Sequence, residues 1–362
     1  MKIVYLTFML LLINLVASAK SFIVKDGKAH AEIVLAEDAK RSTRFAARDL
    51  QVYLEKMSGA KLALVKKPSG KGLVKLFVGE SAGTRALKLS AKGLEHGAYR
   101  LASGSDWLAF LGDDTDFVPK EPWAKNHTDR VTGKYQREWE KASGTPFGVP
   151  NGGMYKNRER MPAELAREPD ERYWTFDERG SFNAVCGFLN QLGVRWYLPG
   201  ELGEVVPQRK TIPLPKLDTV MKPDFPLRQF NVRFSTASDP TTMWMMRLGT
   251  RNPYGLMVAH GMHTMTHNEH TLKNHPDWFA LYGGKRAIKL GERLNHLCYS
   301  NPELFKATVK WARAQFDVYD YHSVSIMPPD AYGSICQCKL CEGKQIDEMG
   351  SRGKLSNHVW DF

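Results

Sequence analysis

After residue 19, the sequence has no apolar run of the roughly 20 residues that a membrane-spanning helix needs. The long apolar run lies at the start instead, over residues 3–16, and it follows the positive charge of Lys2. The small residues Ala17-Ser18-Ala19 come next. This layout is typical of an export signal, with cleavage expected after Ala19. We therefore expect a secreted or periplasmic protein without a membrane span.

Cysteine is scarce, since five residues in a chain of 362 are too few for a disulfide scaffold. The sequence also has no stripe in which basic and aromatic residues alternate, so its formal charge of +12 does not indicate nucleic-acid binding. We interpret the charge as a solvated basic surface. The alternative is attraction to acidic polymers, such as uronate-bearing or sulfated glycans.

Residues 20–206 read as an α/β domain in which short strands alternate with two helices. The helices are expected over 40–57 and 179–192, where apolar residues recur on one face and a glycine, Gly59 or Gly193, follows the last turn. Strand-like runs occupy 22–35, 73–78, 99–101 and 107–111, the last two forming a hairpin. Residues 113–178 are polar and rich in glycine and proline, which predicts an insertion. A lid over a site and a disordered excursion are both compatible with this segment.

Five prolines between residues 207 and 226 predict an extended linker and a domain boundary. Strand and helix patterns alternate again over residues 227–362, which is typical of parallel β/α units. Strands are expected over 227–234, 256–259, 294–299 and 324–327, and helices over 241–248 and 301–316. The second of these helices has a good start, with Asn301 at the cap and Pro302 at the first position.

Four stretches of the sequence resemble one bacterial family, the domain of unknown function 4838. They are GVRWYLPGELGE at 193–204, HPDWFALY at 275–282, CYSNP at 298–302, and PD at 329–330 followed by CQCKLC at 336–341. Members of this family resemble α-glucuronidases and β-hexosaminidases. The resemblance implies a small α/β domain of the hexosaminidase domain 2 type, followed by a (β/α)₈ TIM barrel of which residues 227–362 would form the first half.

A barrel of this kind has its active site at the carboxyl ends of its strands. Asp330 follows the fourth expected strand, where the resembled glycosidases place an acidic residue. Glycoside hydrolysis generally uses two carboxyl groups, so Asp330 is the catalytic candidate. Ala331 stands where hexosaminidases carry a glutamate, which disfavours their substrate-assisted mechanism. A structural role for Asp330, capping a turn, is the alternative.

The ends of the other expected strands supply substrate-binding candidates. Arg233 has the fork geometry that pairs with a carboxylate, although arginine also forms structural ion pairs. Histidines at 260, 263, 267 and 270 are spaced for metal binding, but the glutamate of an H-E-x-x-H motif is missing. We therefore expect the first two of them to hydrogen-bond a sugar. The substrate-binding candidates are Arg233, His260, His263, Tyr299 and Asn301.

The cluster Cys336, Cys338 and Cys341 has the spacing of metal ligands. Tetrahedral zinc needs a fourth ligand, and His322 and Cys298 are the available donors. A disulfide within the cluster is the rival interpretation in an oxidising compartment. Either role would be structural.

These patterns predict a protein that resembles glycoside hydrolases. Its expected substrate is an extracellular polysaccharide, and acidic polysaccharides are among the candidates. No cofactor is expected to be required, and a structural zinc ion is compatible with the cysteines. A non-catalytic carbohydrate-binding protein and a zinc-dependent hydrolase using the histidines are the alternatives. Residues 227–362 are shorter than the roughly 250 residues of a complete barrel. The barrel is therefore expected to be incomplete, and the chain alone to be hydrolytically inactive. Dimerisation of a genuine half-barrel is the alternative, and the sequence leaves the oligomeric state open.

Overall fold

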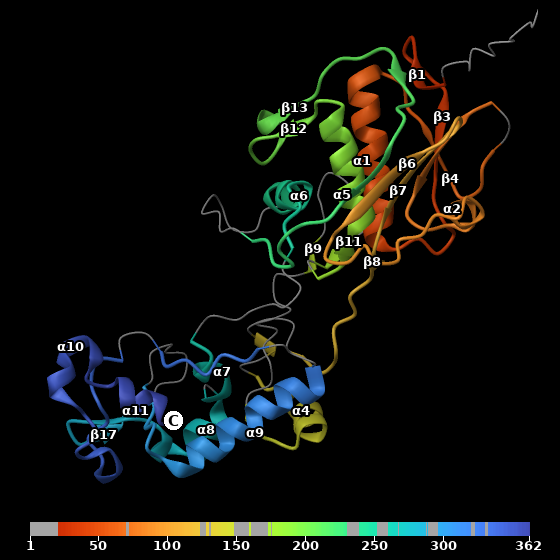
Figure 1. The fold of residues 1–362 in the computed structure, drawn as a ribbon. Coiled ribbons are helices and arrows are strands. Elements are labelled where there is room, and N and C mark those ends of the chain that lie inside the picture. Colours follow the sequence, from red (N-terminus) through yellow and green to blue (C-terminus); the bar gives the residue numbers. More distant parts are fainter. Residues whose placement is uncertain are drawn as a thin grey trace, which may run out of the picture.

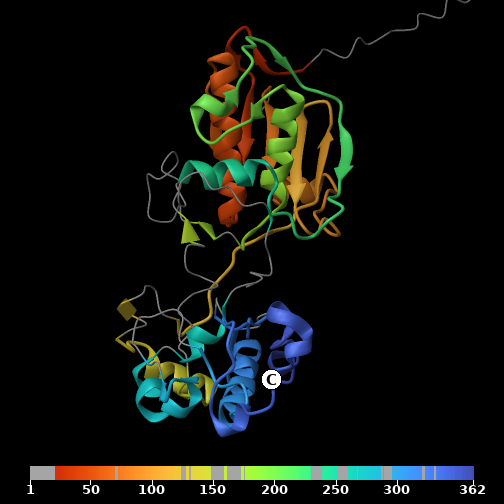
Figure 2. The ribbon, with the colours of Figure 1, turned by 90° about the vertical axis from the view of Figure 1, so that its left-hand side faces the viewer.

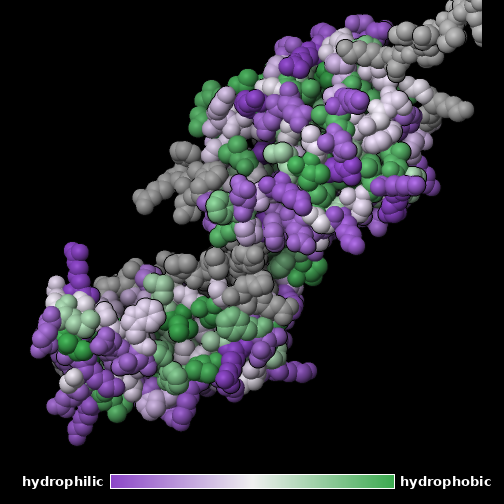
Figure 3. All heavy atoms as spheres, in the orientation of Figure 1, coloured by the Kyte–Doolittle hydropathy of each residue, from purple (hydrophilic) through white to green (hydrophobic). Residues whose placement is uncertain are grey.

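A computed structural model shows a chain folded into two bodies, each with its own hydrophobic core (Figures 1 and 2). The described residues are 21–69, 72–123, 128–129, 132–147, 159–160, 173–174, 176–229, 239–251, 260–266, 268–286, 288, 296–319, 323–329 and 332–362. The expected signal peptide therefore lies outside them. In the described part of the chain, no helix has the length and apolar character needed to cross a membrane. Hydrophilic residues cover much of the visible surface of both bodies (Figure 3).

The first body is built on a six-stranded mixed sheet with the order β15-β6-β7-β5-β3-β4. Strands β3, β4, β5 and β7 are parallel, whereas β6 pairs with β7 and with β15 in antiparallel fashion. The predicted hairpin is confirmed, with Tyr99 opposite Gly112 and Ser103 opposite Leu108. The bounds are β3 (Ala31–Val34), β4 (Ala63–Val65), β5 (Val74–Val78), β6 (Tyr99–Ser103), β7 (Trp107–Gly112) and β15 (Asp218–Met221).

Helices α1 (Arg41–Ser58) and α5 (Gly180–Gln191) cover one face of this sheet, as Figure 2 shows. Both coincide with predicted helices, and their apolar stripes form the main core with the sheet. Gly59 ends α1 with φ +80°, a left-handed conformation that favours glycine because it has no Cβ. The short helix α2 (Ala82–Ala86) begins with a capping box between Ser81 and Thr84.

The proline-rich segment contributes strands, where the sequence predicted only an extended linker. Residues Ile212–Pro213 (β14) pair with β1 (Phe22–Lys25), which also pairs with β2 (Lys28–Ala29). The four residues of β15 lie between Pro215 and Pro223 and form the edge of the large sheet. Proline is tolerated at such edges because an edge strand needs only one set of backbone hydrogen bonds. Proline density alone therefore does not exclude pairing.

Helix α6 (Asp239–Arg247), predicted over 241–248, packs on the first body. Nε1 of Trp244 donates a hydrogen bond of 3.0 Å to the backbone oxygen of Trp196, in β12 (Arg195–Trp196), which pairs with β13 (Glu204–Val205). Arg247 donates two bonds, of 2.9 and 3.1 Å, to the carboxylate of Asp49 in α1. Both charged side chains are buried. A segment that follows the proline-rich residues thus completes the first core.

Replacing Arg247 with methionine should lower the free energy of unfolding by about 3–5 kcal/mol, because Asp49 would be left buried without its counter-charge. The measurement is a shift of the urea midpoint at constant m-value. The double variant Arg247→Met/Asp49→Leu should recover most of the loss. If the Arg247→Met protein were as stable as the wild type, the Arg247–Asp49 ion pair would make no net contribution to the free energy of unfolding.

The second body combines described parts of the insertion with the later half of the chain. Its core contains Trp139 of α4 (Gln136–Ser143), Met262 and Met265 of α7 (Met262–Thr266), and Trp311 of α9 (Pro302–Tyr319). Trp139 stacks on Tyr319 with ring centroids 5.7 Å apart. The insertion also forms the short pairs β8 (Asp114–Thr115) with β11 (Glu178–Arg179) and β9 (Glu159–Arg160) with β10 (Tyr173–Trp174). The β8–β11 pair lies against α1 of the first body, where the hydroxyl of Thr43 donates to Asp114, so the described residues of the insertion contribute to both bodies.

The described residues of 227–362 do not form a closed barrel. Of the expected strands, 324–327 is not assigned to a strand, and among the described residues of 294–299, Leu297 forms an isolated bridge with Phe279. Most of the first expected strand and all of the second lie outside the described residues. A four-residue apolar run packs equally well as a strand or as a buried loop, so periodicity alone could not distinguish them. The remaining elements are α8 (Glu269–Asn274), β16 (Leu281–Tyr282), β17 (Lys285–Arg286), α10 (Gly350–Gly353) and α11 (Ser356–Trp360).

Candidate metal centre and neighbouring polar cluster

Four cysteines, Cys298, Cys336, Cys338 and Cys341, bring their sulfur atoms within 4.8 Å of one another. The sulfur of Cys298 lies 3.5 Å from those of Cys338 and Cys341, which are 3.7 Å apart. A zinc ion with Zn–S bonds of about 2.3 Å would require sulfur atoms roughly 3.8 Å apart in a tetrahedron. A disulfide requires about 2.05 Å, and all four cysteines are free. The described geometry is one that could hold a metal ion.

The cluster is assembled by three local segments. Cys298 lies in the turn before α9, and the other cysteines lie on residues 336–341, which end in a 3₁₀ turn. The β16–β17 hairpin positions this loop, because Leu281 N donates to the sulfur of Cys336 at 3.3 Å and Gln337 N donates to Leu281 O at 2.9 Å. Amide bonds to a sulfur orient it and stabilise its thiolate form. The sequence predicted three ligands and named Cys298 and His322 as available donors. The structure places Cys298 beside the other three cysteines, and His322 lies outside the described residues.

Most of the cluster is buried, with Cys298, Cys336 and Cys341 each 1% exposed and Cys338 half-buried. Burial alone would raise the pKa of the Cys338 thiol. Hydrogen bonds with Cys298, Cys336 and Cys341 outweigh this effect, so the pKa is lowered to about 7. Burial raises the pKa of Cys298. With four sulfur ligands, a tetrahedral ion has no open position for a water or a substrate, so the arrangement suits a structural metal.

Two of the predicted site residues, Arg233 and Asp330, lie outside the described residues. His260 is described, and its Nδ1 lies 2.6 Å from the carbonyl oxygen of Pro328. A carbonyl only accepts hydrogen bonds, so this nitrogen carries the proton. The backbone approaches closely here as well, since a Cβ at Gly261 would lie 1.7 Å from the oxygen of Ser325. His260 is thereby placed against the segment that leads into Asp330.

His263 and Asn301 are engaged in local structure. Nδ1 of His263 contacts the backbone oxygen of His260. The side-chain oxygen of Asn301 accepts hydrogen bonds from the amides of Glu303 and Leu304, at 2.9 and 3.1 Å, which confirms the predicted cap of α9. Its amide nitrogen donates to Asp277 at 2.7 Å.

Tyr299 lies in a group of rings beside the cysteines. Its ring centroid is 5.2 Å from that of Tyr332, 6.4 Å from that of His358 and 5.0 Å from that of Phe362. Tyr299 and His358 are 5% and 2% exposed, and Tyr332 is half-buried. Sequence reasoning named Tyr299 but not Tyr332 or His358. They follow no expected strand, so the barrel rule gave no reason to select them.

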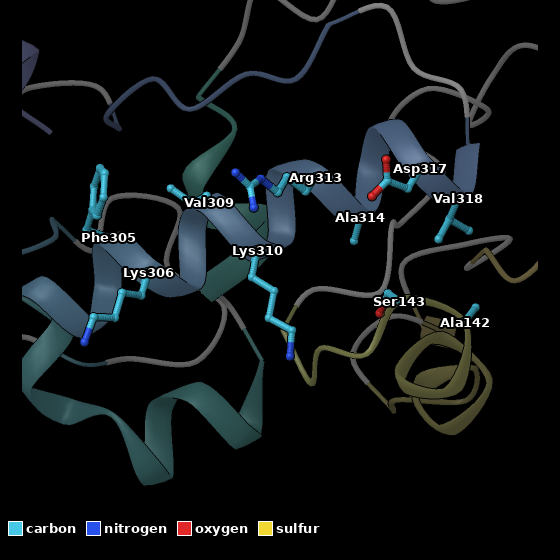
Figure 4. Close-up of a pocket in the computed structure, with 10 residues that line it drawn as sticks. All are labelled: Ala142, Ser143, Phe305, Lys306, Val309, Lys310, Arg313, Ala314, Asp317 and Val318. Carbon is cyan, nitrogen blue, oxygen red and sulfur yellow. The ribbon is translucent and has the colours of Figure 1, made fainter.

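Two hollows of the described surface lie elsewhere. A groove of about 490 Å³ runs between α9 and the end of α4, and Figure 4 shows Lys310 and Val318 on its α9 side and Ser143 on its α4 side. The second hollow, of about 240 Å³, lies where β5 and β7 end and α1 begins, and it is lined in part by Glu80, Asp113 and Asp114. No predicted site residue lines either of them.

Asp114, in the smaller hollow, should make stability depend on pH. Burial raises its pKa from 3.8 to about 7, against hydrogen bonds from Ser181 and Thr43. The native state therefore binds more protons than the unfolded state between about pH 4 and 7, and stability should fall as pH rises through this window and level off above it. Asp114→Asn should flatten this part of the profile in urea titrations. The exposed Asp224→Asn should reproduce the wild-type slope, and an unchanged slope in Asp114→Asn would contradict the assignment.

Comparison with known families connects this region to a described group of proteins. Residues 198–360 match the family model "Domain of unknown function (DUF4838)". Over these residues the chain is similar to the DUF4838 family. A search of curated proteins gives no match. The DUF4838 region contains all four cysteines, the ring group around Tyr299, and α6, which packs on the first body.

Proposed function

We propose that this protein is an exported glycoside hydrolase that acts on an extracellular polysaccharide, acidic polymers included. The observation that carries the proposal is the contact between His260 and Pro328. It brings together two segments whose ends the strand-end rule for the expected barrel had assigned to one active site. Asp330 follows Pro328 by two positions, and we assign it the role of general acid or base at the glycosidic oxygen.

The other candidates have roles consistent with this chemistry. His260, whose Nδ1 atom donates to the backbone oxygen of Pro328, would line the sugar-binding cleft, as the sequence predicted. Arg233 would pair with a uronate carboxylate, since its planar fork matches that group. Export would follow from the signal at residues 1–19. The rival function is carbohydrate binding without catalysis.

We further propose that the four-cysteine cluster holds one structural zinc ion. Support comes from separations of 3.5–3.7 Å among the sulfurs of Cys298, Cys338 and Cys341, with all four sulfurs within 4.8 Å. The burial of three of the ligands and the amide bond to Cys336 support it as well. The ion would join the turn before α9 to the 336–341 loop. Like other closed sulfur sites, it would contribute to folding and not to the reaction.

The proposed function is tested by incubating the 362-residue chain with neutral, uronate-bearing and sulfated polysaccharides and measuring new reducing ends. Metal content is measured on the same sample. Turnover of at least one polysaccharide would support the proposed function and overturn the expectation that the chain alone is inactive. We expect one zinc ion per chain. Binding without new reducing ends would favour the carbohydrate-binding alternative, and neither binding nor turnover would refute both. A second zinc ion, required for turnover, would favour a histidine-dependent zinc hydrolase.

A further inference from the structure

The smaller hollow, of about 240 Å³, lies at the carboxyl ends of three parallel strands in the first body. Segments that follow β3, β5 and β7 line it, together with the first turn of α1. The connection after β3 leads into α1, which packs on one face of the sheet, whereas the connection after β5 places Leu89 and Leu94 on the opposite face. These two strands are neighbours. In open α/β sheets, ligands bind in the crevice that forms where adjacent connections leave in opposite directions.

Charged side chains of both signs surround this hollow without pairing. Asp38 and Asp113 contribute carboxylates, and Lys40 and Arg85 contribute cations. Within the described part of the chain, none of these four side chains makes a hydrogen bond or an ion pair. Asp113 is half-buried, and the other three are exposed. Donors and acceptors are thus held apart across one space, and both kinds remain available to a ligand.

Hydrogen bonds fix the walls of the hollow. The carboxylate of Asp114 accepts from the hydroxyl of Thr43 and from the amide of Ser181, both at 3.1 Å, which joins the end of β7 to α1 and α5. The carboxylate of Glu80 accepts from the amide of Ala91 at 2.7 Å, which holds the connection after β5 in place. Walls that are already ordered lose little conformational freedom when a ligand binds.

The lining groups indicate the chemistry of the ligand. Carboxylates only accept hydrogen bonds, whereas ammonium and guanidinium groups only donate them. A hydroxyl does both, so a ring with several hydroxyls would satisfy both kinds of group at once. The apolar side chains of the lining are those of Ala36, Ala39 and Ala91, which offer no aromatic or long aliphatic surface to an apolar ligand.

Size and charge narrow the class of ligand further. A volume of 240 Å³ is below the roughly 300–1,000 Å³ of pockets for drug-sized molecules, so it suits a single ring. Four carboxylates and two cations line the hollow, so a uronate or a sulfate group would meet net repulsion. A metal ion fits less well, because among the described residues the group close enough to hold one is the cysteine cluster.

We propose that this hollow binds a single sugar ring that carries no negative charge. Hydroxyls of the ring would donate to Asp38 and Asp113 and accept from Lys40 and Arg85. No candidate residue of the proposed hydrolysis lines the hollow, so this binding is independent of turnover and goes beyond the proposed function. The first body would then hold sugar in its own right.

The test titrates glucose, galactose and mannose, with glucuronate as the charged probe, into the wild-type chain, Asp113→Ala and Arg85→Ala by calorimetry. We expect saturable binding of at least one neutral sugar and no binding of glucuronate at the same concentrations. Each substitution should weaken the neutral sugar roughly 10- to 100-fold, the range for a lost hydrogen bond to a charged group. Melting temperatures should stay at the wild-type value, since neither side chain bonds to another described group.

Asp224→Ala and Lys67→Ala are the matched controls, because both residues are exposed and neither lines the hollow. Both variants should bind sugar as the wild type does. Wild-type affinity in both Asp113→Ala and Arg85→Ala would overturn the site, as would failure of every neutral sugar to bind. Equal binding of glucuronate would overturn the stated class of ligand. Turnover of polysaccharide, measured separately, decides the proposed function in each case.

Discussion

Replacing Cys298 with alanine is expected to remove zinc from the protein and to lower its melting temperature by roughly 10 °C or more. Without Cys298, the turn before α9 is no longer joined to the 336–341 loop. Loss of a structural metal costs several kcal/mol, and each kcal/mol corresponds to about 2–4 °C for a domain of 150–250 residues. The zinc content of the purified protein and its calorimetric midpoint are the two measurements.

Cys186→Ala is the matched control, because Cys186 is also a buried free cysteine but lies in α5 of the first body. It should keep one zinc ion per chain and lose only the packing of one small side chain. If Cys298→Ala also retained one zinc ion and the wild-type midpoint, the four-sulfur site would be wrong. Reduction with a phosphine that leaves zinc in place should not destabilise the wild type, which separates the metal from a disulfide.

Asp330→Asn should lower turnover of the polysaccharide substrate by roughly 10²- to 10⁴-fold, the usual contribution of a general acid or base. Asparagine has nearly the same shape but cannot exchange a proton at the glycosidic oxygen. Substrate affinity should change far less than the turnover number. Initial rates at saturating substrate, with the melting temperature recorded alongside, measure the effect.

Asp317→Asn, on the exposed surface of α9, is the control for loss of one negative charge in this body. It should keep both turnover and stability. Wild-type turnover in Asp330→Asn would reassign that residue to turn structure. A large loss of stability in Asp330→Asn would support the same reassignment, since capping a turn was the alternative role.

The sequence was most informative where a single periodic signal decides the structure. Helices α1 and α5 follow from apolar stripes closed by Gly59 and Gly193, and α9 begins where Asn301 caps it. The β6–β7 hairpin follows from two apolar runs and a short polar turn. Each of these features is local, so the neighbouring residues suffice to predict it.

Features that depend on distant partners were only partly predictable. The pairing of β15 with β6 joins residues more than 100 positions apart, and the residues between Pro215 and Pro223 carry no local pattern that predicts a strand. Cys298 lies 38 positions before Cys336, outside any short metal-binding motif, so the sequence named it only as one of two donors. The unpaired charges of Asp113 and Arg85 around one hollow become visible only when their surroundings are known.

The exchange of segments between the two bodies has a consequence for the order in which the chain matures. Trp139 reaches its partner Tyr319 only after about 180 further residues exist, and Asp49 waits even longer for Arg247. During synthesis, the apolar surfaces of the two incomplete cores would stay exposed until the late segments are made. Exposed apolar surfaces promote aggregation with other chains. Newly made protein should therefore depend on chaperones that bind unfolded chains, and premature stops after residue 206 should yield aggregates and not a folded first body.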